Sequence, residues 1–271
     1  MNKNMNKTRN WTVLNLVFYF LTLGVNYLGA SGFINNMSQQ DVSDKYHTLI
    51  TPAGFAFSIW GVIYSLLLIT LIYFFVKRKE SRLESLIQSV SPIFILSCLF
   101  NMGWIVAFSY ELLGISTILI FAMLFSLMFI IEKIYKMRNE ISYTLPAITF
   151  SIYGSWVFIA TVVNISAFLI QQEWGGFGVS DSIWTIVVLF IAIAFVLLYL
   201  TLYKNAVFPA SVAWSFIGIY GAYNNGTLSP DMSSIIMGVL LFGIGIFVIA
   251  IIFTFIKNGN SIFPKDKSVN Y

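Results

Sequence analysis

The chain has 271 residues, of which 58% are hydrophobic and only 10% are charged, and its mean hydropathy is +0.84. A soluble domain carries roughly 25% charged residues, so this composition excludes a large soluble catalytic domain and a disordered chain. One cysteine and one histidine cannot form an intrachain disulfide or supply the Cys and His ligands of a zinc site. The composition predicts an all-α, multi-pass membrane protein.

Eight stretches of the chain are apolar enough, over the roughly 20 residues that a helix needs, to span a membrane. The seventh is the shortest, and Pro209 within it could kink its start. The expected transmembrane helices cover residues 11–30, 54–76, 91–110, 112–131, 145–170, 183–203, 206–223 and 233–256.

The basic residues predict the orientation of these spans. With eight spans, 14 of the 15 Lys and Arg residues lie in the termini and the even-numbered loops, and only Lys45 lies on the opposite side. Basic residues accumulate on the cytoplasmic side, so we expect a plasma-membrane protein with a cytoplasmic N-terminus (1–10) and tail (257–271). The net charge of +4 then reflects topology, and we expect no nucleic-acid partner. The 14 residues are Lys3, Lys7, Arg9, Lys77, Arg78, Lys79, Arg82, Lys133, Lys136, Arg138, Lys204, Lys257, Lys265 and Lys267.

The longest predicted outer segment, residues 31–53, holds Asp41, Asp44 and His47 at three-residue spacing. This spacing suits a weak metal site on a short helix, but a solvated helix face carries the same pattern more often. We therefore expect no metal site.

The middles of the spans contain no Asp, Glu, Lys, Arg or His. Proton relays and retinal Schiff bases need an ionisable group within the membrane. A retinal protein is therefore excluded and a proton-coupled transporter is disfavoured, although Asn and backbone oxygens could still bind Na⁺.

Three spans carry aromatic and amide side chains at helical spacing, so each set shares one helix face. Counting 1.5 Å per residue, we expect the three faces to overlap in the outer half of the membrane. Together they could line a cavity for a flat, mostly apolar ligand, although such side chains often only pack a helix bundle. The sets are Phe57, Trp60 and Tyr64; Asn101, Trp104 and Phe108; and Tyr153, Trp156, Ala160 and Asn164.

These residues resemble the motifs of the TspO/MBR family, the tryptophan-rich sensory proteins related to the translocator protein (peripheral benzodiazepine receptor). The second-span pattern W-x-x-L-Y is similar to W-G-V-I-Y, which begins at Trp60. The third-span pattern L-x-x-N-x-x-W-x-x-x-F is similar to C-L-F-N-M-G-W, which ends at Trp104 and is followed by Phe108. The fifth-span pattern Y-x-x-W-x-x-x-A/T-T-x-x-N is similar to Y-G-S-W-V-F-I-A-T-V-V-N, which begins at Tyr153.

The resemblance implies a TspO-like five-helix bundle over residues 11–170, followed by three additional transmembrane helices within 171–256. It implies a pocket beneath the loop that joins the first two spans, which in the family takes porphyrins, sterol-like lipids and synthetic aromatic ligands. Gly54, Phe55, Ser58 and Ile152 depart from the family pattern and leave the pocket rim and the ligand choice open. The ligand-binding residues implied for this chain are Trp60, Tyr64, Asn101, Trp104, Phe108, Trp156, Ala160 and Asn164. For Phe108 and Asn164, which match the family pattern, a packing role stays open as the alternative.

We therefore expect a protein that binds a hydrophobic planar ligand, a tetrapyrrole or sterol-like lipid, for sensing, sequestration or transfer. Its expected partners are membrane lipids and that ligand, and a homodimer stays open. No cofactor is required, although a tetrapyrrole could be bound, and no catalytic residue is expected. Two alternatives stay open: a transporter of a small amphipathic solute without proton coupling, and light- or oxygen-dependent porphyrin breakdown by a Trp side chain, for which no base or metal site is evident.

The seventh span carries small residues on a ladder of four-residue steps, namely Ala206, Ala210, Gly218 and Ala222, with Trp214 between them. Small residues at this spacing allow close helix contact. We expect the three C-terminal spans either to pack against the five-helix core or to take the place of a partner in a homodimer.

Overall fold

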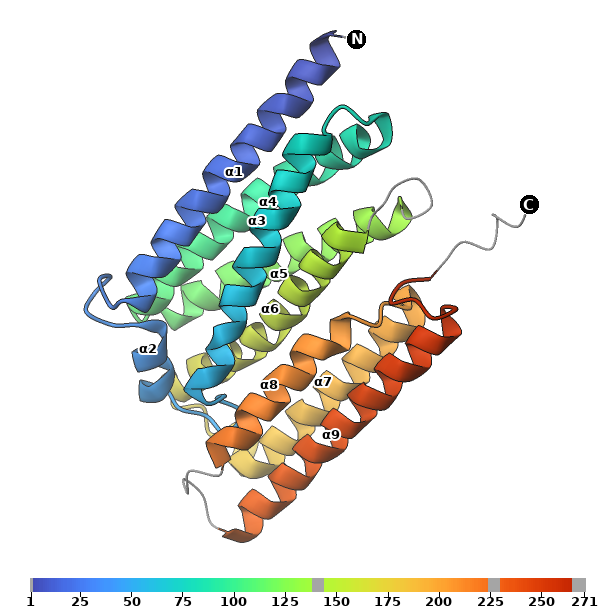
Figure 1. Ribbon diagram of the computed structural model, residues 1–271. Helices are drawn as coiled ribbons and strands as arrows, with labels where there is room; N and C mark the ends of the chain where they lie inside the picture. Colours follow the sequence, from blue (N-terminus) through green and yellow to red (C-terminus); the bar gives the residue numbers. More distant parts are fainter. Residues whose placement is uncertain (1, 138–143, 224–229, 265–271) are drawn as a thin grey trace. The chain divides into compact units, whose positions relative to one another are not determined.

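The computed structural model describes residues 2–137, 144–223 and 230–264, and within them it contains helices and no strand (Figure 1). Three of the basic residues that we predict to be cytoplasmic, Arg138, Lys265 and Lys267, are not among the described residues. The elements are α1 (Asn2–Ala30), α2 (Gln39–Lys45), η1 (Gly54–Ser58), α3 (Ile59–Lys77), α4 (Ser81–Ser109), α5 (Leu113–Lys136), α6 (Thr144–Gln171), η2 (Gly176–Gly178), α7 (Asp181–Tyr203), α8 (Phe208–Tyr223) and α9 (Pro230–Lys257).

Seven of the described helices are long and apolar enough to cross a membrane, which confirms an all-α, multi-pass membrane architecture. They are α1, α3, α4, α5, α6, α7 and α9. The predicted span 206–223 corresponds to α8, whose 16 residues are too few by that measure, so the count of eight is not confirmed. Pro209 lies in the first turn of α8, where proline is tolerated because its missing N–H has no helical acceptor.

The helices differ from the predicted spans mainly at the ends that we predict to be cytoplasmic. The predicted span 91–110 is the second part of α4, which begins ten residues earlier, at Ser81. The predicted span 11–30 is likewise the second part of α1. Hydropathy detects only the apolar part of a helix, whereas backbone hydrogen bonding continues into polar residues such as Glu84 and Gln88.

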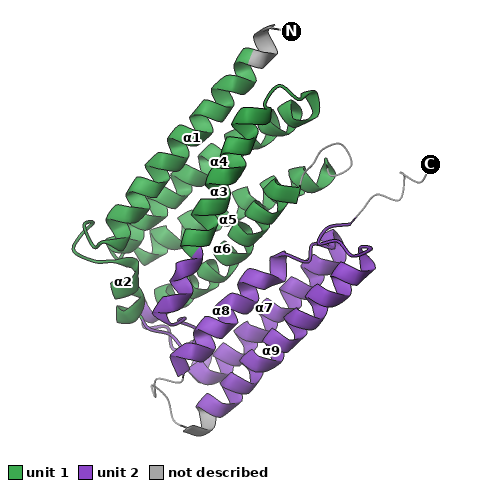
Figure 2. Cartoon of the chain, viewed as in Figure 1, with its two compact units in different colours: residues 1–46, 60–168 green, residues 47–59, 169–271 purple. Residues whose placement is uncertain are grey.

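The chain divides into two compact units, which we describe separately (Figure 2). Unit 1 contains residues 1–46 and 60–168, and unit 2 contains residues 47–59 and 169–271. The five-helix core that the resemblance implies, 11–170, therefore corresponds largely to unit 1. The exceptions are residues 169–170 and the segment 47–59, which includes the end of the first predicted loop and the beginning of the second predicted span; both belong to unit 2.

In unit 1, α4 packs against α1 and α5, and α2 lies against α1 and α4. Large side chains at helical spacing, such as Ile63, Leu67 and Leu71 on α3, are at most 2% exposed. Apolar side chains elsewhere on the unit, such as Ile118 and Phe125, are 60–70% exposed. A helix that is apolar on all sides fits a lipid environment, in which its outer face needs no polar residues.

Hydrogen bonds join α1 to α4 along most of their length. Thr8 donates to Glu84 at 3.0 Å, the Asn15 amide donates to the Ser91 hydroxyl at 2.8 Å, and the Asn26 amide donates to the Asn101 carbonyl oxygen at 2.6 Å. The three residues of α1 cover 18 positions, or about 27 Å of helix. Polar side chains of this kind bond across helices inside a membrane, where water is absent.

Unit 2 contains α7, α8 and α9, together with η1 and η2. The Asn258 amide donates to the Lys204 carbonyl oxygen at 2.8 Å, and the backbone N–H of Ala206 donates to the Ile262 carbonyl oxygen at 3.0 Å. The end of α7, the beginning of α8 and the end of α9 therefore lie together. The ring of Tyr199 stacks on that of Phe208 at 3.8 Å, which fixes α8 against α7.

Candidate functional site

Trp60 lies at the centre of a cluster of aromatic rings in unit 1. Its ring stacks on Tyr64 at a centroid distance of 5.5 Å and faces Trp104 at 6.2 Å. Two rings from α6, Tyr153 at 6.0 Å and Trp156 at 6.3 Å, meet it edge to face. Helices α3, α4 and α6 thus bring the three predicted tryptophans into one ring cluster. Trp60 and Trp156 in this cluster are 96 residues apart in the sequence.

The rings of the cluster differ in exposure. Trp104 and Trp156 are 7% and 3% exposed, whereas Trp60 and Tyr64 are partly exposed. The Tyr64 hydroxyl is buried and has no hydrogen-bond partner within the part of the chain that the structure describes. A buried hydroxyl without a partner is costly, so this position favours a polar group from a ligand or a water molecule.

Asn101 is fully buried beside the cluster and joins three helices. Its carbonyl oxygen accepts the bond from Asn26 on α1, and its amide donates to the Tyr153 hydroxyl on α6 at 3.3 Å. Sequence reasoning missed Asn26 as a member of this site and treated Tyr153 only as a motif residue. The signal for Asn26 was an amide within an apolar span, which is rarely placed against lipid.

Asn164, also buried, holds the other side of the cluster. Its carbonyl oxygen accepts a 2.8 Å hydrogen bond from the Trp104 indole, and its amide donates to Thr117 and Ser116 on α5 at 2.8 and 3.0 Å. Because both its oxygen and its nitrogen are bonded within the bundle, the Asn164 side chain is held in place and orients Trp104. Ser116 and Thr117 had not been predicted as site residues.

The two remaining predicted residues lie at the edges of the cluster. Phe108 approaches Trp104 at 5.7 Å and packs in a buried group with Val42, Leu113 and Ala167, which ties it to the bundle core. Ala160 lies one turn beyond Trp156 on α6 and is partly exposed.

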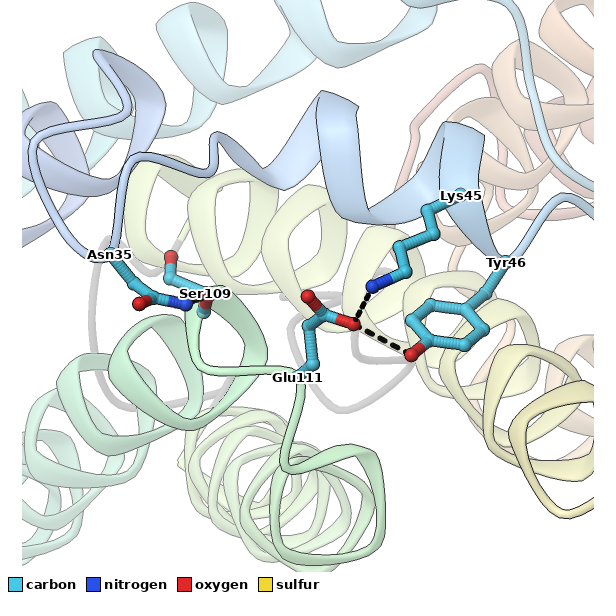
Figure 3. Close-up of polar contacts among 5 residues, drawn as sticks. All are labelled: Asn35, Lys45, Tyr46, Ser109 and Glu111. Atoms are coloured by element: carbon cyan, nitrogen blue, oxygen red, sulfur yellow. Dashed lines mark hydrogen bonds and ion pairs between the residues drawn. The ribbon is translucent and has the colours of Figure 1, made fainter.

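The segment after α1 is fastened to the turn between α4 and α5 (Figure 3). Glu111 in this turn accepts from the Lys45 ammonium group at 2.5 Å and from the Tyr46 hydroxyl at 2.6 Å. The Asn35 amide donates to the Ser109 carbonyl oxygen at 3.0 Å. The hydrogen bonds from Lys45 and Tyr46 lower the pKa of Glu111 below its ordinary value, and Glu111 raises the pKa of Lys45.

The acidic residues of the predicted outer segment have structural partners. Ser38 and Asp41 form a capping box at the beginning of α2, which lowers the pKa of Asp41, and Gln40 donates to Asp44. His47 lies beyond α2, in unit 2. Over residues 2–137, 144–223 and 230–264, no group of His, Cys, Asp and Glu is arranged to hold a metal ion.

The chain was compared with known proteins. No curated protein and no solved structure gave a significant match. The family model described as TSPO-like protein matches residues 12–253, a range that includes the C-terminal helices as well as the predicted five-helix core. Because the match covers most of the chain, this multi-pass membrane protein belongs to the TSPO-like family, as its motifs predicted.

Proposed function

We propose that the ring cluster around Trp60 binds a hydrophobic planar ligand, a tetrapyrrole or a sterol-like lipid, in the outer half of the membrane. The output would be sensing, sequestration or transfer of that ligand. We propose binding without catalysis, because breakdown of a porphyrin would need the Trp side chains themselves to react.

One observation carries this proposal: a partly exposed tryptophan surrounded by four other rings. Aromatic rings bind a flat apolar ligand by stacking and edge-to-face contact, at low entropic cost because they are already packed. The unpartnered hydroxyl of Tyr64 adds a polar group at the same place. The Asn101 amide is engaged by Asn26 and Tyr153, so we propose that it contributes by holding Tyr153 in place.

A second candidate function is transport of a small amphipathic solute. The hydrogen bonds between α1 and α4 favour it, because they place polar groups along about 27 Å of the bundle. The buried carbonyl oxygen of Asn15 has no hydrogen-bond partner in the described part of the chain and could bind a passing solute. Accumulation of a labelled solute in proteoliposomes would favour transport, and saturable binding without accumulation would favour the binding protein.

We further propose that the chain crosses the plasma membrane eight times, with both termini in the cytoplasm. The ends of α7 and α9 lie together. If both helices span the membrane, the chain between them must return across it, and α8 is the helix in that position. Its 16 residues extend about 24 Å, slightly less than the roughly 30 Å of the hydrocarbon core.

The binding proposal is tested by titrating the purified protein in nanodiscs with protoporphyrin IX. We expect saturable quenching of tryptophan fluorescence in the micromolar range, since energy transfer requires the porphyrin to lie near the rings. Cholesterol, as a sterol probe that does not quench, should compete with the porphyrin if the site accepts both ligand classes. Quenching that stays linear in porphyrin concentration would indicate only partition into the lipid and would contradict the proposal.

A further inference from the structure

The polar side chains of the ring cluster are neutral, and two of them are already engaged within unit 1. The Trp104 indole donates to Asn164 at 2.8 Å. The Tyr153 hydroxyl accepts from the Asn101 amide at 3.3 Å and donates to the sulfur atom of Met123 at 3.4 Å. A ligand could pair with either group only by breaking a hydrogen bond inside the bundle.

The Tyr64 hydroxyl differs from these two groups. It is buried and has no hydrogen-bond partner among the described residues, while its ring is stacked on Trp60. Its backbone is held as well, because the buried Tyr19 on α1 donates to the Tyr64 carbonyl oxygen at 3.0 Å and meets the Tyr64 ring edge to face at 6.5 Å. A hydroxyl held in this way is preorganised for one hydrogen bond with a ligand.

The helices that carry Trp60, Tyr64 and Trp156 supply no charge near the cluster. Helix α6 contains no Asp, Glu, Lys, Arg or His, and the charged residue of α3 is Lys77, 13 positions after Tyr64. This separation is about 20 Å along a helix. Neither helix therefore offers a cation to a ligand in the cluster.

Helix α4 brings a charge closer, but this charge is paired. Glu111 follows the end of α4, seven positions after Trp104, and it forms an ion pair with Lys45. The Lys45 ammonium group is therefore already engaged by a carboxylate of the chain itself.

A charged group of a ligand would be costly in these surroundings. A carboxylate that leaves water without a cation loses its hydration without compensation. A carbonyl, ester or alcohol oxygen loses much less, and one hydrogen bond from a hydroxyl compensates for that loss. The cluster is therefore suited to distinguish ligands by charge as well as by shape.

We propose that the cluster binds ligands whose buried part is uncharged, and that a ligand oxygen atom pairs there with the Tyr64 hydroxyl. A sterol alcohol meets this requirement. A tetrapyrrole meets it when its carboxylates are esterified or stay outside the cluster. The inference rests on the proposed function, because it names the chemical class of ligand for the same site.

The first test compares protoporphyrin IX with its dimethyl ester, for the wild type and for Ala160→Lys in nanodiscs, by the Soret band of each porphyrin. Ala160 is partly exposed one turn beyond Trp156, so the variant adds a cation beside the cluster. Val162→Lys is the matched control, because Val162 is also partly exposed and lies on the opposite face of α6. The ratio of the two affinities is compared between variants, so that unequal partition of the probes into the lipid cancels.

We expect the wild type to bind the ester about tenfold more tightly than the acid. Ala160→Lys should remove most of this preference, and Val162→Lys should leave it unchanged. Equal affinities of the wild type for acid and ester, or an ester preference that Ala160→Lys does not reduce, would overturn the selection by charge.

The second test concerns the Tyr64 hydroxyl and needs only the loss of one atom. Cholesterol and cholestane, the same skeleton without the hydroxyl group, are titrated as competitors of the bound porphyrin ester. We expect the wild type to prefer cholesterol about three- to tenfold, the effect of one hydrogen bond, and Tyr64→Phe to lose this preference. Tyr110→Phe is the control, because Tyr110 is 53% exposed at the end of α4. A preference that Tyr64→Phe retains would overturn the pairing.

Failure of the inference differs from failure of the proposed function. If neither the porphyrins nor cholesterol bind the wild type saturably, the proposed function fails and the ligand class fails with it. If they bind saturably and Trp60→Phe, Trp156→Phe weakens them, but acid and ester bind equally, the binding site stands and only its selection of uncharged ligands is overturned.

Discussion

The indole N–H of Trp104 on α4 donates a 2.8 Å hydrogen bond to the side-chain oxygen of Asn164 on α6. Both residues belong to stretches that resemble TspO/MBR motifs, and both are less than 10% exposed. The bond joins two helices and fixes the plane of an indole that faces Trp60. Asn164 of the third motif-like stretch thus orients the Trp104 ring of the second.

Replacing Asn164 should therefore destabilise the bundle by leaving the Trp104 indole without its acceptor. We expect Asn164→Leu to lower the free energy of unfolding by about 1–3 kcal/mol, the cost of a buried unsatisfied donor, measured by titration with a denaturing detergent. In Trp104→Phe the donor is already absent, so adding Asn164→Leu should cost clearly less. Equal costs in the two backgrounds would contradict the assigned hydrogen bond.

The bond between Asn26 and Asn101 predicts a second coupling, between α1 and α4. We expect each single Leu substitution to cost about 1–2 kcal/mol of unfolding free energy, because it leaves an amide unpaired in a membrane interior. The double variant Asn26→Leu, Asn101→Leu should cost less than the sum of the two. Ser65→Ala is the control, since Ser65 is exposed and bonds only within its own helix. Additive costs would exclude the pairing.

The ion pair between Lys45 and Glu111 predicts a pH dependence. Lys45 and Tyr46 lower the pKa of Glu111 in the folded protein below 4.5. The stability that the Glu111 carboxylate contributes is therefore complete above about pH 4.5, and it is lost as pH falls through the pKa of the folded state. Glu111 raises the pKa of Lys45 above 10.5. The stability that the Lys45 charge contributes is therefore lost only as pH rises beyond about 10.5. Glu111→Gln should lower the melting temperature slightly at pH 7.

At pH 3 the difference in melting temperature between the wild type and Glu111→Gln should shrink. Glu80→Gln serves as the matched variant, because Glu80 pairs with Lys77 three residues away and both side chains are about half exposed. We expect this variant to have little effect at either pH. A Glu111→Gln effect that is undiminished at pH 3 would show that the carboxylate charge does not fasten the segment.

The eight-crossing topology predicts where single cysteines can be labelled in a Cys98→Ser background. An impermeant maleimide should reach Phe33→Cys in intact cells, because Phe33 is 80% exposed and lies in the predicted outer segment. Lys79→Cys and Lys257→Cys should react only after the membrane is opened. If α8 does not cross, Lys257→Cys should react from outside while Lys79→Cys remains protected.

The sequence was sufficient to group the rings of the candidate site. Periodicity placed Trp60 and Tyr64 on one helix face and Trp104 and Trp156 on two others, and the family motifs indicated that these faces meet. Spacing within each helix is fixed by 3.6 residues per turn, so side chains on one face could be identified without a structure.

Contacts between helices could not be predicted in the same way. The pairing of Asn26 with Asn101 depends on the register of α1 against α4, which a single amide does not encode. The ladder at Gly218 indicated a close contact, but its partner is the segment 52–56 of the preceding loop. The helix ends in polar residues, such as Ser81 at the beginning of α4, were missed because hydropathy does not detect them.

The most direct measurement is the affinity of protoporphyrin IX for the wild type and for Trp60→Phe, Trp156→Phe in nanodiscs, followed by the porphyrin Soret band. This readout does not depend on the tryptophans that are removed. Trp174→Phe is the control, because Trp174 lies in unit 2 and outside the ring cluster. We predict saturable binding that the double variant weakens about tenfold and that Trp174→Phe leaves unchanged. Equal affinities of the wild type and the double variant would contradict binding at Trp60.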